Sequence, residues 1–192
     1  MPAYEVGFTI LAVDSSGSAP DLNAYADLVL NALKSLIGLG VAQASENLVG
    51  TYQGPGSASD KSASILELAI TGSGMDPGIA VEALTVNGTD WLARIQRKSG
   101  MAKRKFLDFR LYPTNLQQAL SGGGTKQVFQ AVIQDKSALA DAGTPTCISW
   151  QTVGELELDG QPLDRFVIKF DESGVAVAVE WRALGAVYNR NS

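Results

Sequence analysis

Short runs of alternating apolar residues, separated by turn residues, recur through most of the chain and constrain its fold more than any other feature. Such runs occupy residues 64–70, 105–112, 126–134, 164–170 and 175–184. Their alternation is typical of strands with one buried face. Asn87-Gly88 and Asp159-Gly160 favour two-residue hairpin turns. Because consecutive runs are joined by hairpins and not by long crossovers, we expect mainly antiparallel pairing.

The middle of the chain predicts a meander of long strands. Residues 81–98 predict two strands joined by the first of these turns. A further strand over 105–112 is expected to end at Pro113, since proline cannot donate a ladder hydrogen bond. Residues 114–120 are then expected to form one or two helical turns.

A helical period is found in one long segment, residues 18–38. Apolar residues recur there at spacings of three and four, from Leu22 to Ile37, as on one face of a helix. Ser18 is a favourable N-cap, and the glycines at 38 and 40 are expected to end the helix.

Together these patterns predict an α+β fold that is rich in β structure. We expect a mainly antiparallel sheet or sandwich of about eight strands, one long N-terminal helix packed on it and a long projecting hairpin. No segment is long enough to divide the chain, so residues 1–192 are expected to form a single domain.

The residue types exclude several kinds of chemistry. The chain has no histidine and one cysteine, Cys147. Internal disulfides, zinc sites built on Cys and His, haem ligation by His, and Ser-His or Cys-His nucleophile pairs are therefore excluded. Catalysis would need paired carboxylates or a Ser/Lys dyad, and neither pattern stands out. We expect a non-enzymatic protein with no cofactor.

Positive charge is concentrated in one segment of a chain whose net charge is −5. The cations of residues 94–110 are Arg94, Arg97, Lys98, Lys103, Arg104, Lys105 and Arg110, and the segment has one acid, Asp108. Such a cluster attracts anions. Three interpretations stay open: docking on an acidic patch of another copy, nucleic-acid binding with help from interleaved aromatic residues, or a solvated hairpin end with no partner.

The segment 14–18, D-S-S-G-S, follows an expected strand over residues 4–13 and fits the pattern D-x-S-x-S. It resembles the first metal-ion loop of von Willebrand factor A domains, in which an Asp and two Ser bind Mg²⁺. The resemblance implies a metal-dependent adhesion or ligand-binding role for Asp14, Ser16 and Ser18. It is confined to residues 6–49, because the chain turns into hairpins where that family alternates strands and helices. Any strand-to-helix turn favours the same residue types without a metal.

The hairpins of residues 82–112, the helix 18–38 and the meander 147–183 resemble bacteriophage virion proteins such as tail-tube, tail-completion and head-decoration subunits. The resemblance implies a structural protein, found in the virion or in the host cytoplasm, that assembles with copies of itself and other structural subunits. Under it, the hairpin end 94–105 and the Gly/Ser-rich loop 50–61 are expected to contact neighbouring subunits. The chain begins without the basic region and cleavage site of a signal peptide, and its apolar runs are shorter than the roughly 18 residues that span a bilayer. We therefore expect a soluble protein with no membrane partner.

Overall fold

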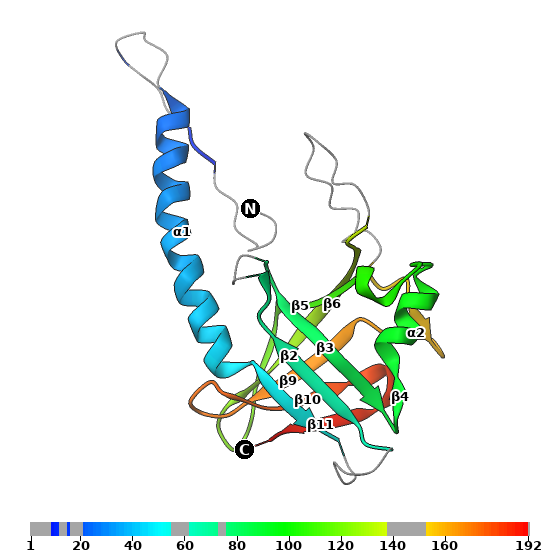
Figure 1. Ribbon diagram of the computed structural model, residues 1–192. Helices are drawn as coiled ribbons and strands as arrows, with labels where there is room; N and C mark the ends of the chain where they lie inside the picture. The colour runs from blue at the N-terminus through cyan, green and yellow to red at the C-terminus, as the bar shows by residue number, and fades with distance from the viewer. Residues whose placement is uncertain are drawn as a thin grey trace.

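The computed structural model of the chain describes residues 9–11, 15, 21–54, 62–72, 76–137 and 153–191. These residues form a β-rich α+β fold with one large antiparallel sheet, a long N-terminal helix and a second, shorter α-helix (Figure 1). The predicted fold class is confirmed.

The described residues contain eleven strands, nine of which belong to one sheet. In chain order the strands are β1 Gly50–Gln53, β2 Ile65–Ala69, β3 Ile79–Val86, β4 Thr89–Asp90, β5 Leu107–Ala119, β6 Thr125–Asp135, β7 Glu157–Leu158, β8 Gln161–Pro162, β9 Arg165–Phe170, β10 Ala176–Trp181 and β11 Ala186–Arg190. β7 and β8 form a separate hairpin around the predicted Asp159-Gly160 turn. The other predicted turn, Asn87-Gly88, joins β3 to β4 with positive φ at both residues, as a type I′ turn requires.

The large sheet closes on itself. Its strand order is β2-β1-β11-β10-β9-β6-β5-β3-β4, and β2 also pairs with β3. Eight strands therefore form a continuous antiparallel ring, while β4 extends the sheet beyond β3. The sheet is thus a barrel, a closure that the predicted antiparallel sheet or sandwich did not include. Closure gives each of the eight strands a partner on both sides.

Aromatic side chains fill the barrel. The rings of Phe166 and Trp181 stack with centroids 5.6 Å apart and planes at 3°, and Trp91 meets Trp181 edge-on at 5.3 Å. The indole N–H of Trp181 donates to the carbonyl of Leu163 at 2.8 Å. An eight-stranded barrel is just wide enough for its own side chains to fill. Its interior is therefore a packed core.

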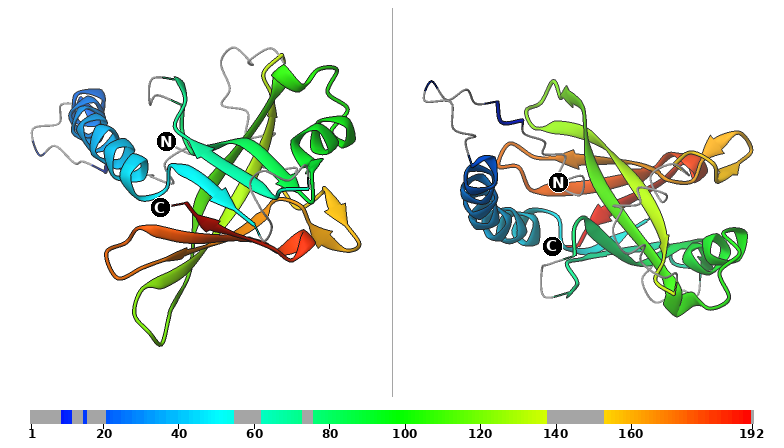
Figure 2. Two further views of the ribbon diagram at one scale, coloured as in Figure 1. Left: turned by 60° about the horizontal axis from the view of Figure 1, so that its bottom comes forward. Right: turned by 90° about the horizontal axis from the view of Figure 1, so that it is seen from above.

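Helix α2 (Trp91–Lys98) covers one side of the barrel (Figures 1 and 2). The prediction of a strand over these residues was wrong. The buried side chains are Trp91, Leu92 and Ile95, a spacing that only a helix places on one face. Asp90 caps the helix, because its carboxylate accepts a hydrogen bond of 3.0 Å from a backbone N–H of the first turn.

Helix α1 (Leu22–Asn47) stands on the opposite side and meets the barrel through its carboxyl half (Figures 1 and 2). Its N-cap is Asp21, not Ser18, and it continues through Gly38 and Gly40, which were predicted to end it. Each glycine costs about 1 kcal/mol relative to alanine in a helix. The following residues are mostly good helix formers, and contacts with the barrel hold the carboxyl end.

Strands β5 and β6 form a long hairpin, whereas the projecting hairpin was predicted in residues 82–112, with its end at 94–105. They pair from Leu107 with Asp135 to Ala119 with Thr125. The predictions that the strand ends at Pro113 and that helical turns follow were wrong. Pairing with β3 stops at Leu111, so Pro113 lies on a free edge beside a register shift, where its missing N–H leaves no ladder bond unmade.

Tyr188 links two strands of the barrel and gives the fold a pH dependence. Its hydroxyl donates to the carbonyl of Thr85 at 3.0 Å, and burial raises the pKa of this hydroxyl above its ordinary value of about 10. Above pH of about 10 the tyrosine of the unfolded chain releases a proton that the folded chain keeps, so the free energy of unfolding falls as pH rises.

Replacing Tyr188 tests this link. We expect Tyr188→Phe to lower the free energy of unfolding by about 1 kcal/mol near neutral pH. Above pH of about 10 the free energy of unfolding of the variant should fall less steeply than that of the wild type. Urea denaturation across this range measures both, and parallel curves would contradict the assignment.

Candidate functional site

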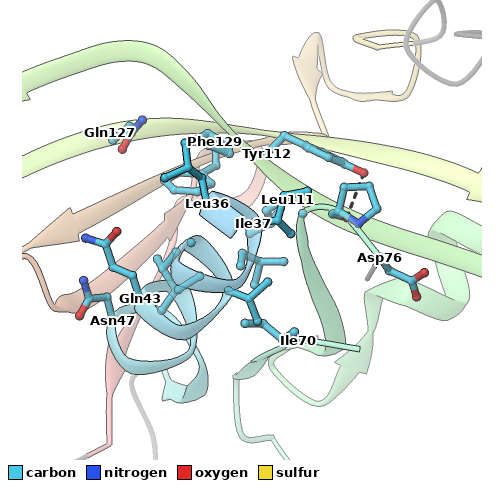
Figure 3. A pocket seen from close by; sticks show the side chains of 18 of the residues that line it. Leu36, Ile37, Gln43, Asn47, Ile70, Asp76, Leu111, Tyr112, Gln127 and Phe129 are labelled. Carbon is cyan, nitrogen blue, oxygen red and sulfur yellow. Dashed lines mark hydrogen bonds between the residues drawn. The ribbon is translucent and has the colours of Figure 1, made fainter. Parts of the chain in front are cut away.

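A cavity of about 560 Å³ lies between the carboxyl half of α1 and the barrel (Figure 3). We call it the α1 pocket. On the barrel side it is formed where β2 ends, β3 begins and β9 ends, together with the middle of β5 and β6. Its principal lining side chains are Leu33, Leu36, Ile37, Val41, Ala44 and Leu48 of α1 and Ile70, Ile79, Leu111, Tyr112, Phe129 and Phe170 of the barrel.

The α1 side of the pocket follows from the sequence of the helix. Leu33, Ile37, Val41, Ala44 and Leu48 recur at spacings of three and four, which places them on one face. This face is the stripe that the sequence predicted for the helix, extended by about two and a half turns past its expected end at residue 38. The wall is therefore mainly apolar, and Gln43 and Asn47 add amide groups to it.

The carboxyl end of α1 is fixed to the barrel by Arg190 of β11. Its guanidinium donates to the carbonyls of Glu46 at 3.1 Å, Asn47 at 3.1 Å and Val49 at 2.8 Å. A cation at this end also interacts favourably with the helix dipole. The hydroxyl of Tyr52 adds a hydrogen bond of 2.8 Å to the carbonyl of Leu48. These contacts set where the helix stands and so define one wall of the pocket.

The opposite rim, residues 76–78, is fixed by Arg110 of β5. This side chain is 3% exposed, and its Nε donates to both carboxylate oxygens of Asp108 at 2.9 and 3.0 Å. Its terminal nitrogens bind Asp76 at 3.2 Å, the carbonyls of residues 77 and 78 at 3.4 Å, and the hydroxyl of Thr71. Arg110 therefore ties the loop before β3 to β5 and holds the rim in place.

Gly78 shows how closely this rim is packed. Its φ is 79°, and a Cβ atom there would lie 2.8 Å from the ring of Tyr112. Only glycine allows both the backbone conformation and the approach of the ring. The Tyr112 hydroxyl donates to the carbonyl of Pro77 at 3.2 Å (Figure 3). Tyr112 is thus held at this rim by the packing of its ring against Gly78 and by the hydrogen bond of its hydroxyl.

Polar groups are few in the pocket and almost all are uncharged. Gln43 and Asn47, one turn apart on α1, lie on the opposite side of the pocket from Asp76 in Figure 3, and Gln127 of β6 adds a third amide. Asp76 is the one formally charged side chain among the lining residues, and its charge is balanced by Arg110. The site is an apolar cavity with amide groups.

The pocket has little of what bond-making chemistry needs. Among its lining residues the ionisable side chains are Asp76 and Tyr112, and both are held by hydrogen bonds within the rim. Within the ranges that the structure describes, no group of three His, Cys, Asp or Glu side chains is placed to hold a metal ion.

The six cations expected to contact a partner lie together on the α2 side of the barrel. Arg94, Arg97 and Lys98 belong to α2, whereas Lys103, Arg104 and Lys105 lie in or beside the short 3-10 helix Arg104–Phe106. We call this group the cationic surface. Among the described residues none of the six has a carboxylate within 4.0 Å.

The expected hairpin at residues 94–110 is absent, because these residues form α2, a turn, the 3-10 helix and the start of β5. Arg110 was counted with the exposed cations but points into the buried rim of the pocket. Local contacts hold part of the cationic surface: Arg94 lies 4.9 Å over the Trp91 ring, and Lys98 donates to the carbonyl of Glu157 at 2.9 Å.

Other predicted site residues cannot be placed. Asp14, Ser16 and Ser18 lie outside the described residues, as does Cys147. Of the loop 50–61, residues 50–53 form β1 of the barrel, and residues 55–61 lie outside the described ranges.

The sequence reasoning missed the pocket and the two arginines that build it. The helical stripe of α1 was recognised, but its continuation past Gly40 was not. Strand β11 was not predicted, so Arg190 had no assigned place. The sequence does contain a signal for β11, because the alternation of Ala186, Tyr188 and Arg190 after the β10 run is typical of a further strand.

Residues 40–192 match the family model described as Beta-lactamase-like-like, C-terminal domain. This match covers well over half of the chain. The chain belongs to this family. No curated protein and no solved structure gives a significant match. The family domain comprises the last two turns of α1 and the whole barrel, so Gln43, Asn47 and Arg190 lie inside it, whereas Leu22–Leu39 precede it.

Much of α1 has no apolar partner within the described residues. Leu28 is 69% exposed and Leu39 is 67% exposed, and both lie outside the pocket lining. Among the described helices, α1 is also long and apolar enough to cross a membrane. Core helices of soluble proteins and signal sequences meet the same criterion, so this property assigns no location.

Replacing Arg190 tests how α1 is held. We expect Arg190→Gln to leave the barrel folded but to release the helix, because hydrogen bonds from a charged donor contribute about 1.5–3 kcal/mol. Chymotrypsin should then cut within α1 at least about tenfold faster than in the wild type. Arg182→Gln is the matched control, since Arg182 is exposed and its nearest carboxylate lies 3.8 Å away. Equal cleavage rates in all three proteins would contradict the role of Arg190.

Proposed function

We propose that this chain is a non-catalytic binding domain, in which the barrel is a scaffold and the α1 pocket holds an apolar ligand. The observation that carries the proposal is an apolar cavity of about 560 Å³ outside a barrel whose interior is filled. Pockets for small molecules are typically about 300–1,000 Å³ and mostly apolar, with a few polar groups. The α1 pocket has this size and this composition.

The absence of a catalytic role is part of the same proposal. No general base stands beside a nucleophile among the lining residues, and Asp76 is already paired with Arg110. The family is named for a C-terminal domain. This name supports an accessory role beside another domain, in which the barrel supplies binding and not chemistry.

Two glycines of α1 provide a matched test. A side chain at Gly40 would extend into the pocket, whereas Gly38 does not line it; at both positions a Cβ atom would meet no other atom within 4 Å. We expect Gly40→Phe to weaken binding of the uncharged fluorescent probe N-phenyl-1-naphthylamine at least about tenfold, because the ring occupies the ligand's place. Gly38→Phe should bind the probe like the wild type.

Neither replacement lowers helix propensity, since glycine is the poorer helix former. Loss of probe binding in the Gly40 variant therefore reports on the pocket. If the wild type does not bind the probe, or if the two variants bind it equally, the proposed function is wrong.

A second candidate function is self-assembly, which the exposed apolar side of α1 favours. Leu28 and Leu39 lie 11 residues apart, at the spacing of one helix face, and a second copy of the chain would offer the same surface in return. The cationic surface and the net charge of −5 add an electrostatic route by which copies could attract one another. The role of a virion subunit stays a prediction of this kind.

Particle size at high protein concentration tests self-assembly. We expect the wild type to form dimers or larger particles by sizing with light scattering, and Leu39→Asp to be a monomer, because a charge would be buried unpaired at the interface. Leu116→Asp, at a position of the β5–β6 hairpin with similar exposure, is the control and should assemble normally. A monomeric wild type would rule out this candidate and leave the pocket proposal untouched.

A further inference from the structure

We propose that the ligand of the α1 pocket is an uncharged amphiphile, with an apolar chain or ring system and a neutral head group such as a hydroxyl or an amide. This inference rests on the proposed function and specifies the chemical class of the ligand. It follows from the charges and hydrogen-bonding groups that line the cavity.

An anionic head group has no partner in the pocket. None of the lining residues is a cation. Arg110 braces one rim, and all five of its N–H groups are directed to protein oxygens, of Asp108, Asp76, Thr71 and the carbonyls of residues 77 and 78. No donor of this guanidinium is left for a ligand carboxylate or phosphate. Asp76 would also repel such a group, so an anion would be buried without compensation.

A cationic head group is also poorly matched. Arg110, Lys136, Asp108 and Asp76 form one connected set of ion pairs whose formal charges cancel. Asp76 is half exposed to solvent, which screens its attraction for a ligand. An ammonium entering the apolar cavity would lose its hydration and gain little in return.

Neutral amides supply what an uncharged head group needs. Gln43 and Asn47 each carry a donor and an acceptor at the edge of the cavity (Figure 3). The amide nitrogen of Gln127 donates to the carbonyl of Thr114 at 2.6 Å, so its amide oxygen is the group that can accept a hydrogen bond from a ligand. A hydroxyl or amide head can exchange hydrogen bonds with such groups while the apolar part lies against Ile37, Leu111 and Phe129.

Four ligands of one chain length separate these classes. Decan-1-ol, decanamide, decanoate and decylammonium are used to displace N-phenyl-1-naphthylamine from the wild-type chain near neutral pH. We expect the alcohol and the amide to bind at least about tenfold more tightly than either ion, since leaving a charge unpaired costs more than 1.4 kcal/mol. The Gly40→Phe variant shows how much displacement arises outside the pocket.

A variant of the amide edge tests the head-group contact itself. Gln43→Leu should weaken decanamide binding severalfold while leaving the probe bound, whereas Gln118→Leu, an exposed glutamine of β5 outside the lining, should change neither. Equal or tighter binding of decanoate or decylammonium would overturn the ligand class but keep the pocket. Failure of the probe and of all four ligands to bind in a manner sensitive to Gly40→Phe would overturn the proposed function as well.

Discussion

The stacked rings of Phe166 and Trp181 fill the inside of the barrel, and this packing constrains where a ligand pocket can lie. With Trp91 packed edge-on against Trp181 from the α2 side, the interior is solid. Some eight-stranded barrels hold one small ligand inside, but here the aromatic side chains occupy that space. A binding cavity must therefore be built on the outside, from the end of the barrel and a second element. In this fold the second element is the carboxyl half of α1, and the result is the α1 pocket.

Two arginines convert this juxtaposition into a defined site. Arg190 holds the helix by its last carbonyls, and Arg110 holds the opposite rim by an ion-pair cluster that is nearly buried. Both guanidinium groups donate their hydrogen bonds to oxygen atoms of the protein itself. Charged groups position the walls, while the lining of the cavity is mainly apolar, with three amide side chains and Asp76, which is paired with Arg110. We propose that this lining holds an uncharged ligand; the cationic surface lies on the α2 side, away from the pocket.

Local patterns predicted the elements better than their closure or their site. Alternation and turn dipeptides identified most barrel strands, because these signals are set by neighbouring residues. The segment 91–98 was misassigned because Trp91, Ala93 and Ile95 also alternate; the N-cap Asp90 was the signal for a helix. The predicted end of the strand at Pro113 was wrong because proline is tolerated at a free edge of a sheet, and that edge exists only in the folded sheet. Closure of the ring and the contacts of Arg110 and Arg190 join residues far apart in the chain, and no local pattern encodes them.

The most direct test of a ligand held between α1 and the barrel is a titration of the chain with decan-1-ol, followed by NMR of isoleucine δ-methyl groups. Ile37, Ile70 and Ile79 line the pocket, whereas Ile95 and Ile168 are buried elsewhere in the core and serve as internal references. We predict that the three lining methyl signals shift with one common saturation curve while the two reference signals stay in place. Shifts confined to Ile95 or Ile168, or no shifts at saturating alcohol, would show that the cavity between helix and barrel is not a binding site.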